Sequence, residues 1–406
     1  MLIKRCSVFL AGCVLLLAPA AGAVAAEGIQ LGPTLLFPAL SATGTYDDNF
    51  YLTSNNPESG WETKISPSLR LTLPVQRFYL SAEGGLDFVN YIDVENYFGS
   101  AEENHTDWFG GAAVGADFPG GLSFKIADKY KQIYQTATQE FGVGEDYSEN
   151  ALTATVAYAI RDALKVELSG GRTAYTYDLS LNREYAETTV KADLYWKFRP
   201  AISALIEGSY AAYAYDSNSA QDSTETGVSL GLTWDVTAKS TGFAKAGYAW
   251  KSYDVQNASL GTEDGEYYTL SAGLRHSFTP RTVLVFDLSH ASRESDFPEN
   301  PYYLQTIVAA NLSQRLTSKL YCRVNASYNN EAYPNATSYD NPYDPASGVE
   351  TGKRTDKTLV GDLALGFNAT RWLSFELTYA AESRSSNFDT FEYDQTRVSL
   401  SAKAAL

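Results

Sequence analysis

The feature that most constrains the fold is a strict alternation of apolar and polar residues, which recurs along the chain from about Phe37 onward. Clear examples are residues 188–198, 229–236, 284–289 and 358–367. A period of two places successive side chains on opposite faces of a β-strand. We find no stretch with a sustained helical period, so the sequence predicts an all-β chain whose strands have one apolar and one polar face.

Connections of two kinds alternate between these segments. The short connections are predicted at 74–77, 118–121, 161–163, 199–201, 237–240, 279–282, 317–319 and 369–371. The long, polar and acidic ones are predicted at 52–60, 93–106, 135–147, 177–184, 216–224, 255–264, 294–301, 330–355 and 385–391. Eight short and nine long connections join 18 strands, and an even number of strands places both termini on the same side.

Short turns on one side and long loops on the other are typical of a bacterial outer-membrane barrel. Lipid offers no hydrogen bonds, so each membrane-spanning strand must be paired on both edges, and closure of the sheet satisfies this. The predicted fold class is therefore an all-β, transmembrane antiparallel β-barrel of about 18 strands, which occupies residues 27–406.

Residues 1–26 have the pattern of a cleaved secretory signal peptide. Lys4 and Arg5 precede an apolar run, and Ala23-Val24-Ala25 resembles a cleavage site. Two alternatives are a membrane anchor, which Pro19 disfavours, and a lipoprotein signal at residues 10–13. Export would place the mature chain in the outer membrane of a Gram-negative bacterium, in contact with outer-membrane lipid.

The net charge narrows the class of partner. It is formally -17, which disfavours nucleic acid as a ligand because nucleic-acid-binding proteins need a basic surface.

Aromatic residues gather at the predicted strand ends, as the two interfacial girdles of a membrane barrel require. The girdle near the short connections comprises Phe78, Phe118, Trp196, Phe198, Trp234, Phe278, Phe367 and Trp372. The other comprises Tyr91, Trp108, Tyr134, Tyr175, Tyr210, Tyr248, Trp250, Tyr267, Tyr268, Tyr328 and Tyr379.

The polar face of the strands should line the lumen. Candidate lumen-facing residues are Arg70, Lys129, Lys131, Lys191, Asp193, Tyr195, Lys197, Glu207, Tyr213, Lys245, Lys251, Tyr253, Arg275, Arg293, Tyr321 and Arg323. Charges of both signs suit a water-filled channel for hydrophilic solutes, and they also suit ion pairs that only stabilise the barrel. Lumen tyrosines offer flat amphipathic surfaces to sugar rings, with simple filling of the interior as the alternative.

No pattern of an enzyme or cofactor site emerges. The HExxH motif and the P-loop are absent. His290 with Ser289 or Ser292 is the one candidate pair for hydrolysis, and serines are common in this chain. Acidic clusters in the long connections lack the spacing of an EF-hand. We therefore expect no enzymatic activity, cofactor or metal.

The first predicted strand ends in Tyr46, Asp47, Asp48, Asn49 and Phe50. This motif, the polar stretch 54–60 and the run Ile65-Ser66-Pro67-Ser68-Leu69 resemble the "putative β-barrel porin 2" family of outer-membrane proteins. The resemblance implies a porin that serves as a conduit for an exopolysaccharide or capsular polysaccharide, with a periplasmic polysaccharide-export protein as partner. For the motif itself we expect a structural role, because Asp and Asn at a strand end satisfy local backbone donors.

Two other functions remain open at this stage. One is a general or substrate-specific diffusion porin for small hydrophilic solutes, and the other is a non-conducting surface barrel. The long connection at 330–355, with Pro334, Pro342 and Pro345, is a candidate for folding inward and constricting or plugging the lumen. The sequence leaves the oligomeric state open.

Overall fold

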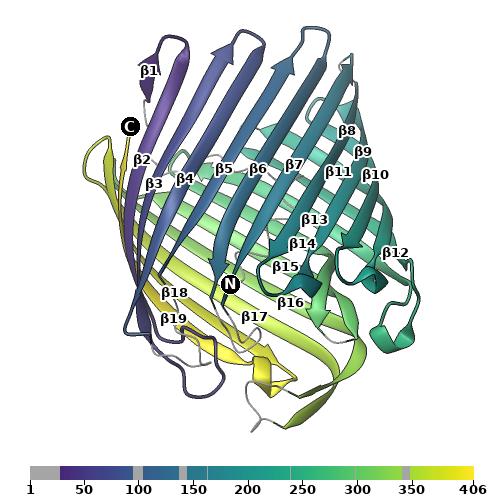
Figure 1. Cartoon of the computed structure of the whole chain (residues 1–406). Coiled ribbons are helices and arrows are strands. Elements are labelled where there is room, and N and C mark those ends of the chain that lie inside the picture. The colour runs from purple at the N-terminus through teal and green to yellow at the C-terminus, as the bar shows by residue number, and fades with distance from the viewer. Residues whose placement is uncertain are drawn as a thin grey trace.

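The computed structural model describes residues 28–94, 104–136, 144–161, 163–237, 239–297, 299–340 and 348–406. The predicted signal peptide, residues 1–26, lies outside these ranges. One antiparallel sheet curves round to form a barrel, and the strands are tilted relative to its axis (Figure 1).

The strands are β1 (Ile29–Leu31), β2 (Thr34–Asp47), β3 (Gly60–Val75), β4 (Phe78–Ile92), β5 (His105–Asp117), β6 (Leu122–Gln135), β7 (Glu145–Ile160), β8 (Leu164–Tyr177), β9 (Tyr185–Arg199), β10 (Ile202–Tyr215), β11 (Ser223–Thr237), β12 (Ser240–Tyr253), β13 (Gly265–Thr279), β14 (Thr282–Phe297), β15 (Asn300–Arg315), β16 (Leu320–Asp340), β17 (Val349–Asn368), β18 (Leu373–Ser386) and β19 (Tyr393–Ala405). Short 3-10 turns are η2 (Leu181–Arg183), η3 (Ser219–Gln221), η4 (Ala258–Leu260) and η5 (Asp389–Phe391). Within the described ranges, no helix has the length and hydropathy required to cross a membrane.

Closure of the barrel depends on the pairing of β19 with β2, from Arg397 opposite Asp47 to Ala405 opposite Ala39. The strands from β2 to β19 each pair antiparallel with the next along the chain, and β1 pairs only with the start of β2. The wall is thus a closed ring of 18 strands, and the predicted fold class is confirmed.

The two faces of the wall differ as the alternation predicts. Leu194, Leu230, Leu363 and Leu400 are among the apolar side chains exposed on the outer face. Bulky aromatic side chains such as Trp196 are exposed near the short turns, and others are exposed near the opposite rim. A lipid bilayer would cover this surface, because acyl chains favour apolar contact and aromatic rings favour the interface.

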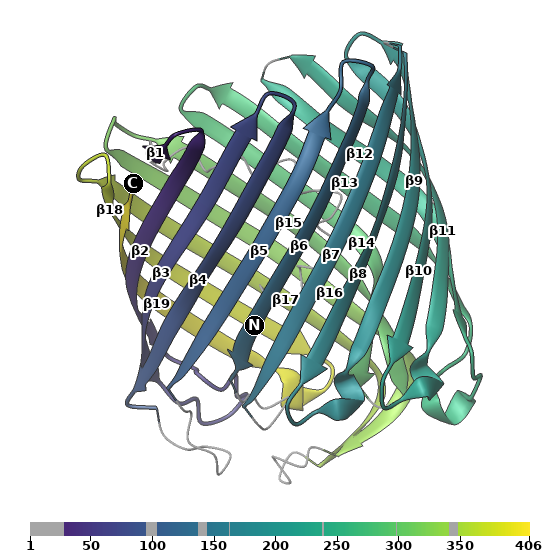
Figure 2. The same cartoon turned by 45° about the horizontal axis from the view of Figure 1, so that its top comes forward.

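The two rims also differ. The short turns lie at one end, where β2 begins and β19 ends, and the longer connections with their 3-10 turns lie at the other, which we call the outer mouth (Figure 2). In outer-membrane barrels the side with long loops faces the exterior.

Two predicted loops are wrong. Residues 294–297 and 300–301 belong to β14 and β15, and Phe297 pairs with Asn300, so a long loop at 294–301 is replaced by a tight hairpin. Most of 330–355 is also strand, because β16 and β17 remain paired from Ala336–Lys353 to Asp340–Val349 beyond an irregularity at Ala332. Pro342 and Pro345 lie outside the described residues. At both places the polar, loop-like composition predicted a loop, whereas cross-strand pairing extends the strands.

Candidate functional site at the outer mouth

The hairpin between β14 and β15 leaves the wall and folds into the lumen. Among the described residues, pairing of β14 with β13 stops at His290 opposite Leu270, although β13 continues to Gly265. Pairing of β15 with β16 begins only at Leu304. Between these points β14 and β15 pair only with each other. We call this segment, residues 291–297 and 299–303, the inner hairpin.

The local sequence explains the departure. In the lower half of β14, Leu284, Phe286 and Leu288 occupy the lipid-facing positions, whereas Ser292, Glu294 and Asp296 would occupy them further up. Charged side chains on the lipid face are destabilising. On the other side, Pro301 falls in the part of β15 that is not paired with β16, which is consistent with the missing amide donor of proline.

Glu294 joins the inner hairpin to the barrel wall. Its carboxylate accepts a hydrogen bond from Tyr215 OH of β10 at 2.9 Å and pairs with Lys251 Nζ of β12 at 2.5 Å. The Lys251 side chain is fully buried, and its ammonium lies 4.1 Å from the ring centroid of Tyr213. Because these contacts join non-adjacent strands, they lie on the inner face of the ring and identify which face of each strand is the inner one.

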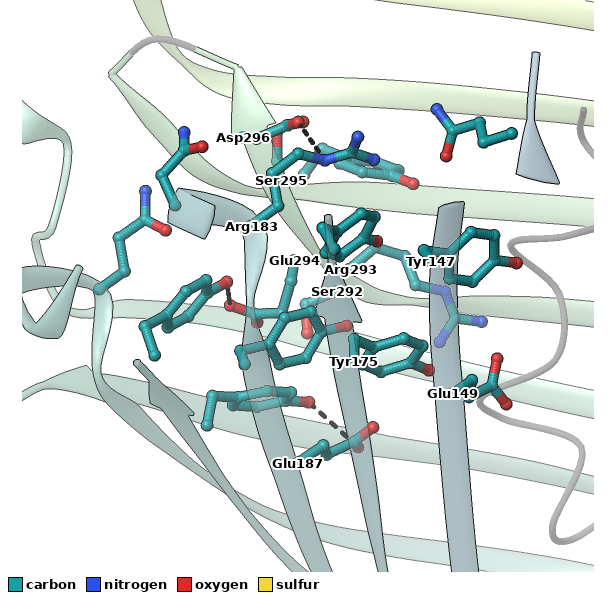
Figure 3. Close-up of a pocket in the computed structure, with 18 residues that line it drawn as sticks. Tyr147, Glu149, Tyr175, Arg183, Glu187, Ser292, Arg293, Glu294, Ser295 and Asp296 are labelled. Carbon is teal, nitrogen blue, oxygen red and sulfur yellow. Dashed lines mark hydrogen bonds and ion pairs between the residues drawn. The ribbon is translucent and has the colours of Figure 1, made fainter. Parts of the chain in front are cut away.

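Three further contacts tie the same hairpin to the wall. Asp296 Oδ2 lies 2.9 Å from Arg183 Nε, in η2 between β8 and β9, as the dashed line in Figure 3 shows. Ser292 donates a hydrogen bond to Glu225 of β11 at 2.6 Å, and Tyr267 OH of β13 donates to Ser292 Oγ at 2.6 Å. Since β9 and β14 are five places apart in the ring, the hairpin crosses part of the lumen.

Asn335 of β16 anchors the tip from the other side. Its N–H donates to Asn300 Oδ1 at 2.8 Å, and its side-chain amide donates to the carbonyl of Glu299 at 2.8 Å. The same amide reaches the carbonyl of Gly261, between β12 and β13, at 3.4 Å. A Cβ on Gly261 would lie 1.9 Å from the Glu299 carbonyl oxygen, so only glycine allows this approach.

An aromatic cluster buries the end of the hairpin against β16 and the connection between β18 and β19. The aromatic cluster comprises Phe297, Tyr303, Tyr333, Phe388 and Phe391. The fully buried Arg354 guanidinium lies 3.4 Å from the ring centroid of Phe391 and pairs with Asp356 at 2.7 Å. Such a desolvated cation is retained where aromatic faces and a carboxylate compensate its lost hydration.

A pocket with a volume of about 150 Å³ lies between the inner hairpin and the part of the wall formed by β6 to β10 with the turns η2 and η3 (Figure 3). Tyrosine rings on neighbouring strands stack along it: Tyr147 on Tyr177 at 5.6 Å, Tyr175 on Tyr185 at 4.8 Å, and Tyr185 on Tyr215 at 5.1 Å between centroids. This cross-strand stack forms one side of the pocket, and Ser292–Asp296 of the hairpin approach it from another.

Several candidate lumen residues have partners on the inner face. Lys131 pairs with Glu149 at 2.6 Å, Lys245 with Glu207 at 2.7 Å, and Arg323 with Glu376 at 2.6 Å. The remaining contacts are Lys129 with Glu83, Arg70 over Phe37, Tyr195 beneath Lys165, Tyr253 beside Lys251, Arg293 with Gln305, and Tyr321 with Glu376. Strand register puts Lys191, Asp193, Lys197 and Arg275 on the same face. Only Tyr213 and Arg293 of the candidates line the pocket.

The sequence analysis missed most of the pocket. It assigned Tyr175 and Tyr267 to the lipid-facing girdle, and this assignment is wrong, because both side chains are buried on the inner face. The alternation did indicate an inward side chain, since Tyr175 lies on the same face of its strand as Lys165 and Glu167. Glu294 and Asp296 were assigned to a loop, and no local pattern shows that a hairpin would fold inward.

The motif from Tyr46 to Phe50 lies at the closure between the first and last barrel strands. Asp47 Oδ2 accepts from Gln395 at 2.7 Å, and Asp48 Oδ1 accepts from the N–H of Thr396 at 2.6 Å. Buried Asn49 donates to the carbonyls of Thr53 and Asp394 at 2.9 and 2.8 Å. Tyr46 contacts Trp61, and Phe50 contacts Tyr91. These contacts favour a structural role for the motif. It satisfies local backbone groups, as expected, and also groups of the neighbouring β19.

The histidine and metal candidates show no reactive arrangement in the described part of the chain. His290 Nδ1 bonds the Thr306 hydroxyl at 2.7 Å, and its ring stacks on Tyr268. Ser292 instead bonds Glu225. Over the same residues, no group of three or more His, Cys, Asp or Glu is placed to hold a metal ion.

A closed antiparallel barrel with an apolar outer face and a polar, ion-paired inner face defines the chain as a porin-type protein of the outer membrane. The family comparison agrees, because the family model "Putative beta-barrel porin 2" matches residues 22–406. The chain therefore belongs to the putative β-barrel porin 2 family. A comparison with curated proteins finds no match.

Solved barrels of similar shape have very different sequences. OpdK of Pseudomonas aeruginosa, solved with vanillate, has a TM-score of 0.48 and 11% identity, over 91% of this chain and 99% of that chain. OprD of the same organism has a TM-score of 0.47 and 12% identity, over 96% and 98%. The copper transporter OprC is longer: the chain spans 62% of its length, with a TM-score of 0.42 and 11% identity over 88% of this chain.

Proposed function

We propose that this protein is a channel for small hydrophilic solutes whose bore is narrowed at the outer mouth by the inner hairpin. The observation that carries the proposal is the path of that hairpin, which leaves both neighbouring strands and reaches Arg183 on another part of the wall. Barrels of this size leave an aqueous channel, and an inserted segment reduces its width. The inner hairpin takes the constricting role that the sequence analysis suggested for 330–355.

Paired charges on the inner face support passage of hydrophilic solutes without strong preference for one sign of charge. Lys131 with Glu149 and Lys245 with Glu207 are examples in which a cation and a carboxylate neutralise each other. A polar lining lowers the cost of transferring a hydrated solute from water into the bore.

Planar-bilayer recording tests the constriction. In the variant, residues 293–303 are replaced by Asn-Gly, which joins Ser292 to its cross-strand partner Leu304 through a two-residue turn. We expect a conducting wild-type barrel and a several-fold larger single-channel conductance in the variant. As a control, Asn55→Gly with Asn56→Gly alters exposed residues of the β2–β3 connection and should leave conductance unchanged.

Equal conductance of the wild type and the shortened variant would contradict the constriction, and absence of current in both would contradict a channel. Export of a polysaccharide with a periplasmic export protein is the alternative that the family resemblance suggests, although a bulky polymer would have to pass the tied inner hairpin. If deletion of the gene abolished a surface glycan and left small-solute uptake unchanged, that alternative would replace our proposal.

The proposal includes the route to the membrane. We infer that residues 1–26 act as a cleaved signal peptide and that residues 27–406 insert into the outer membrane of a Gram-negative bacterium. The basic and apolar pattern of the N-terminal residues supports this. N-terminal sequencing of the membrane-extracted protein should find the mature end near Glu27.

A further inference from the structure

The pocket behind the inner hairpin has little unmatched charge. Of its lining carboxylates, Glu149 pairs with Lys131, Asp296 with Arg183, and Glu294 with Lys251. Glu187 accepts a hydrogen bond from Tyr213, and Arg293 donates one to Gln305. An ionic ligand would have to displace these protein partners, and removing one partner of a buried pair is costly. A neutral ligand avoids that cost.

Two neutral polar groups in the pocket are buried without a hydrogen-bond partner among the described residues. They are the hydroxyl of Tyr175, whose residue is 7% exposed, and the side-chain amide nitrogen of Gln135, whose residue is 5% exposed. Both residues line the pocket. A buried polar group that lacks a partner costs about 1–3 kcal/mol, so a ligand with hydroxyl groups that reaches them would recover this loss.

The tyrosine stack offers the complementary apolar surface. Phenol rings present C–H edges and π faces together with a polar hydroxyl, which suits a flat ligand that is apolar in one direction and hydroxylated in another. The volume of about 150 Å³ is smaller than the roughly 300–1,000 Å³ of pockets for drug-sized ligands. The space therefore fits one small ring.

From these observations we propose that the pocket binds a single saccharide ring, an uncharged and polyhydroxylated solute about the size of a hexose. This inference rests on the proposed function, because it names the class of solute that pauses at the constriction. The inner hairpin forms one side of the pocket, so narrowing of the bore and recognition of the sugar involve the same element.

The test uses D-glucose as the probe, with gluconate and glucosamine as anionic and cationic comparisons of similar size. Titration calorimetry on the folded, detergent-solubilised full-length mature barrel measures binding whether or not the channel conducts. Current block in planar bilayers provides the second readout. We expect saturable binding of glucose, with gluconate and glucosamine at least tenfold weaker.

Two conservative variants locate the site. Tyr175→Phe removes only the unpaired hydroxyl, and Gln135→Leu removes the unpaired amide. Each should weaken glucose binding about fivefold, which corresponds to one lost hydrogen bond of roughly 1 kcal/mol. Tyr79→Phe is the matched control, because Tyr79 lies near the short-turn end of the barrel and does not line the pocket. Heat-modifiable migration on gels verifies that each variant is folded.

The possible outcomes separate the two proposals. A barrel that conducts but neither binds glucose nor is blocked by it would overturn the saccharide site and leave the channel intact. Glucose binding that Tyr175→Phe and Gln135→Leu do not change would also overturn the site. Absence of conductance would contradict the proposed function, while calorimetry would still decide whether the pocket binds the sugar.

Discussion

At the scale of single residues, buried charges hold the inner hairpin in place. Lys251 and Glu294 are both removed from water, and their mutual attraction offsets the cost of desolvation only because Tyr215 and the ring of Tyr213 satisfy the remaining interactions. In a solvent-exposed ion pair both the cost of desolvation and the attraction are smaller. Lys129 and Glu83 lie 4.0 Å apart with largely exposed side chains, and such pairs contribute little to stability.

We expect Lys251→Met to release the inner hairpin, because Glu294 would remain buried without its cation at a cost of about 3–5 kcal/mol. The rate of proteinase K cleavage within residues 291–303, measured on barrels in vesicles, should rise by roughly two to four orders of magnitude. Adding Glu294→Gln should return the rate most of the way to wild type. Lys129→Met serves as the control, and an equal increase in that variant would argue against the pair.

At the scale of elements, the inner hairpin and the wall differ in how they are held. Each wall strand is paired on both sides, whereas the hairpin pairs only with itself and depends on side-chain anchors. Asn335 is the anchor of the hairpin tip, since it contacts Asn300 and Glu299 there, and it also contacts Gly261 between β12 and β13. Segments held by few hydrogen bonds open more readily than the surrounding sheet.

Asn335→Ala should loosen the tip without affecting the wall. The variant loses two side-chain hydrogen bonds of about 1 kcal/mol each, so amide exchange at residues 299–303 should accelerate roughly 30-fold. Hydrogen–deuterium exchange with mass spectrometry measures this effect. Asn311→Ala removes a side-chain contact between the same two strands further down the wall, and exchange at the tip should not respond. Unchanged tip exchange in Asn335→Ala would contradict the anchoring role.

At the scale of the whole molecule, one alternation runs round the closed ring. The registers from β2 to β19 keep the inner-face positions of neighbouring strands opposite one another, and the pairing of Arg397 with Asp47 continues this across the closure to the first strand. The motif from Asp47 to Asn49 strengthens this junction through Gln395 and Thr396. A shift of one residue in any strand would turn its leucines inward.

Neighbouring substitutions test which face contacts lipid. Leu230 is 61% exposed on the outer face of β11, and Ser229 beside it points inward. Leu230→Arg should lower the free energy of unfolding in lipid vesicles by about 2–4 kcal/mol, whereas Ser229→Arg should have little effect. Urea titration of the vesicle-embedded barrel gives both values. Similar losses in the two variants would contradict the assigned faces.

The sequence by itself determined the strand content, the ring of 18 strands, the two rims and the faces of most side chains, because each follows from a local period of two and from where that period is interrupted. Only the tertiary structure decided that the inner hairpin folds inward, that Tyr175 stacks beside Tyr185, and that Glu294 pairs with Lys251. Alternation specifies which side of its own strand a residue takes. Whether a hairpin stays in the wall depends on partners on other strands, and those partners become neighbours only when the sheet closes.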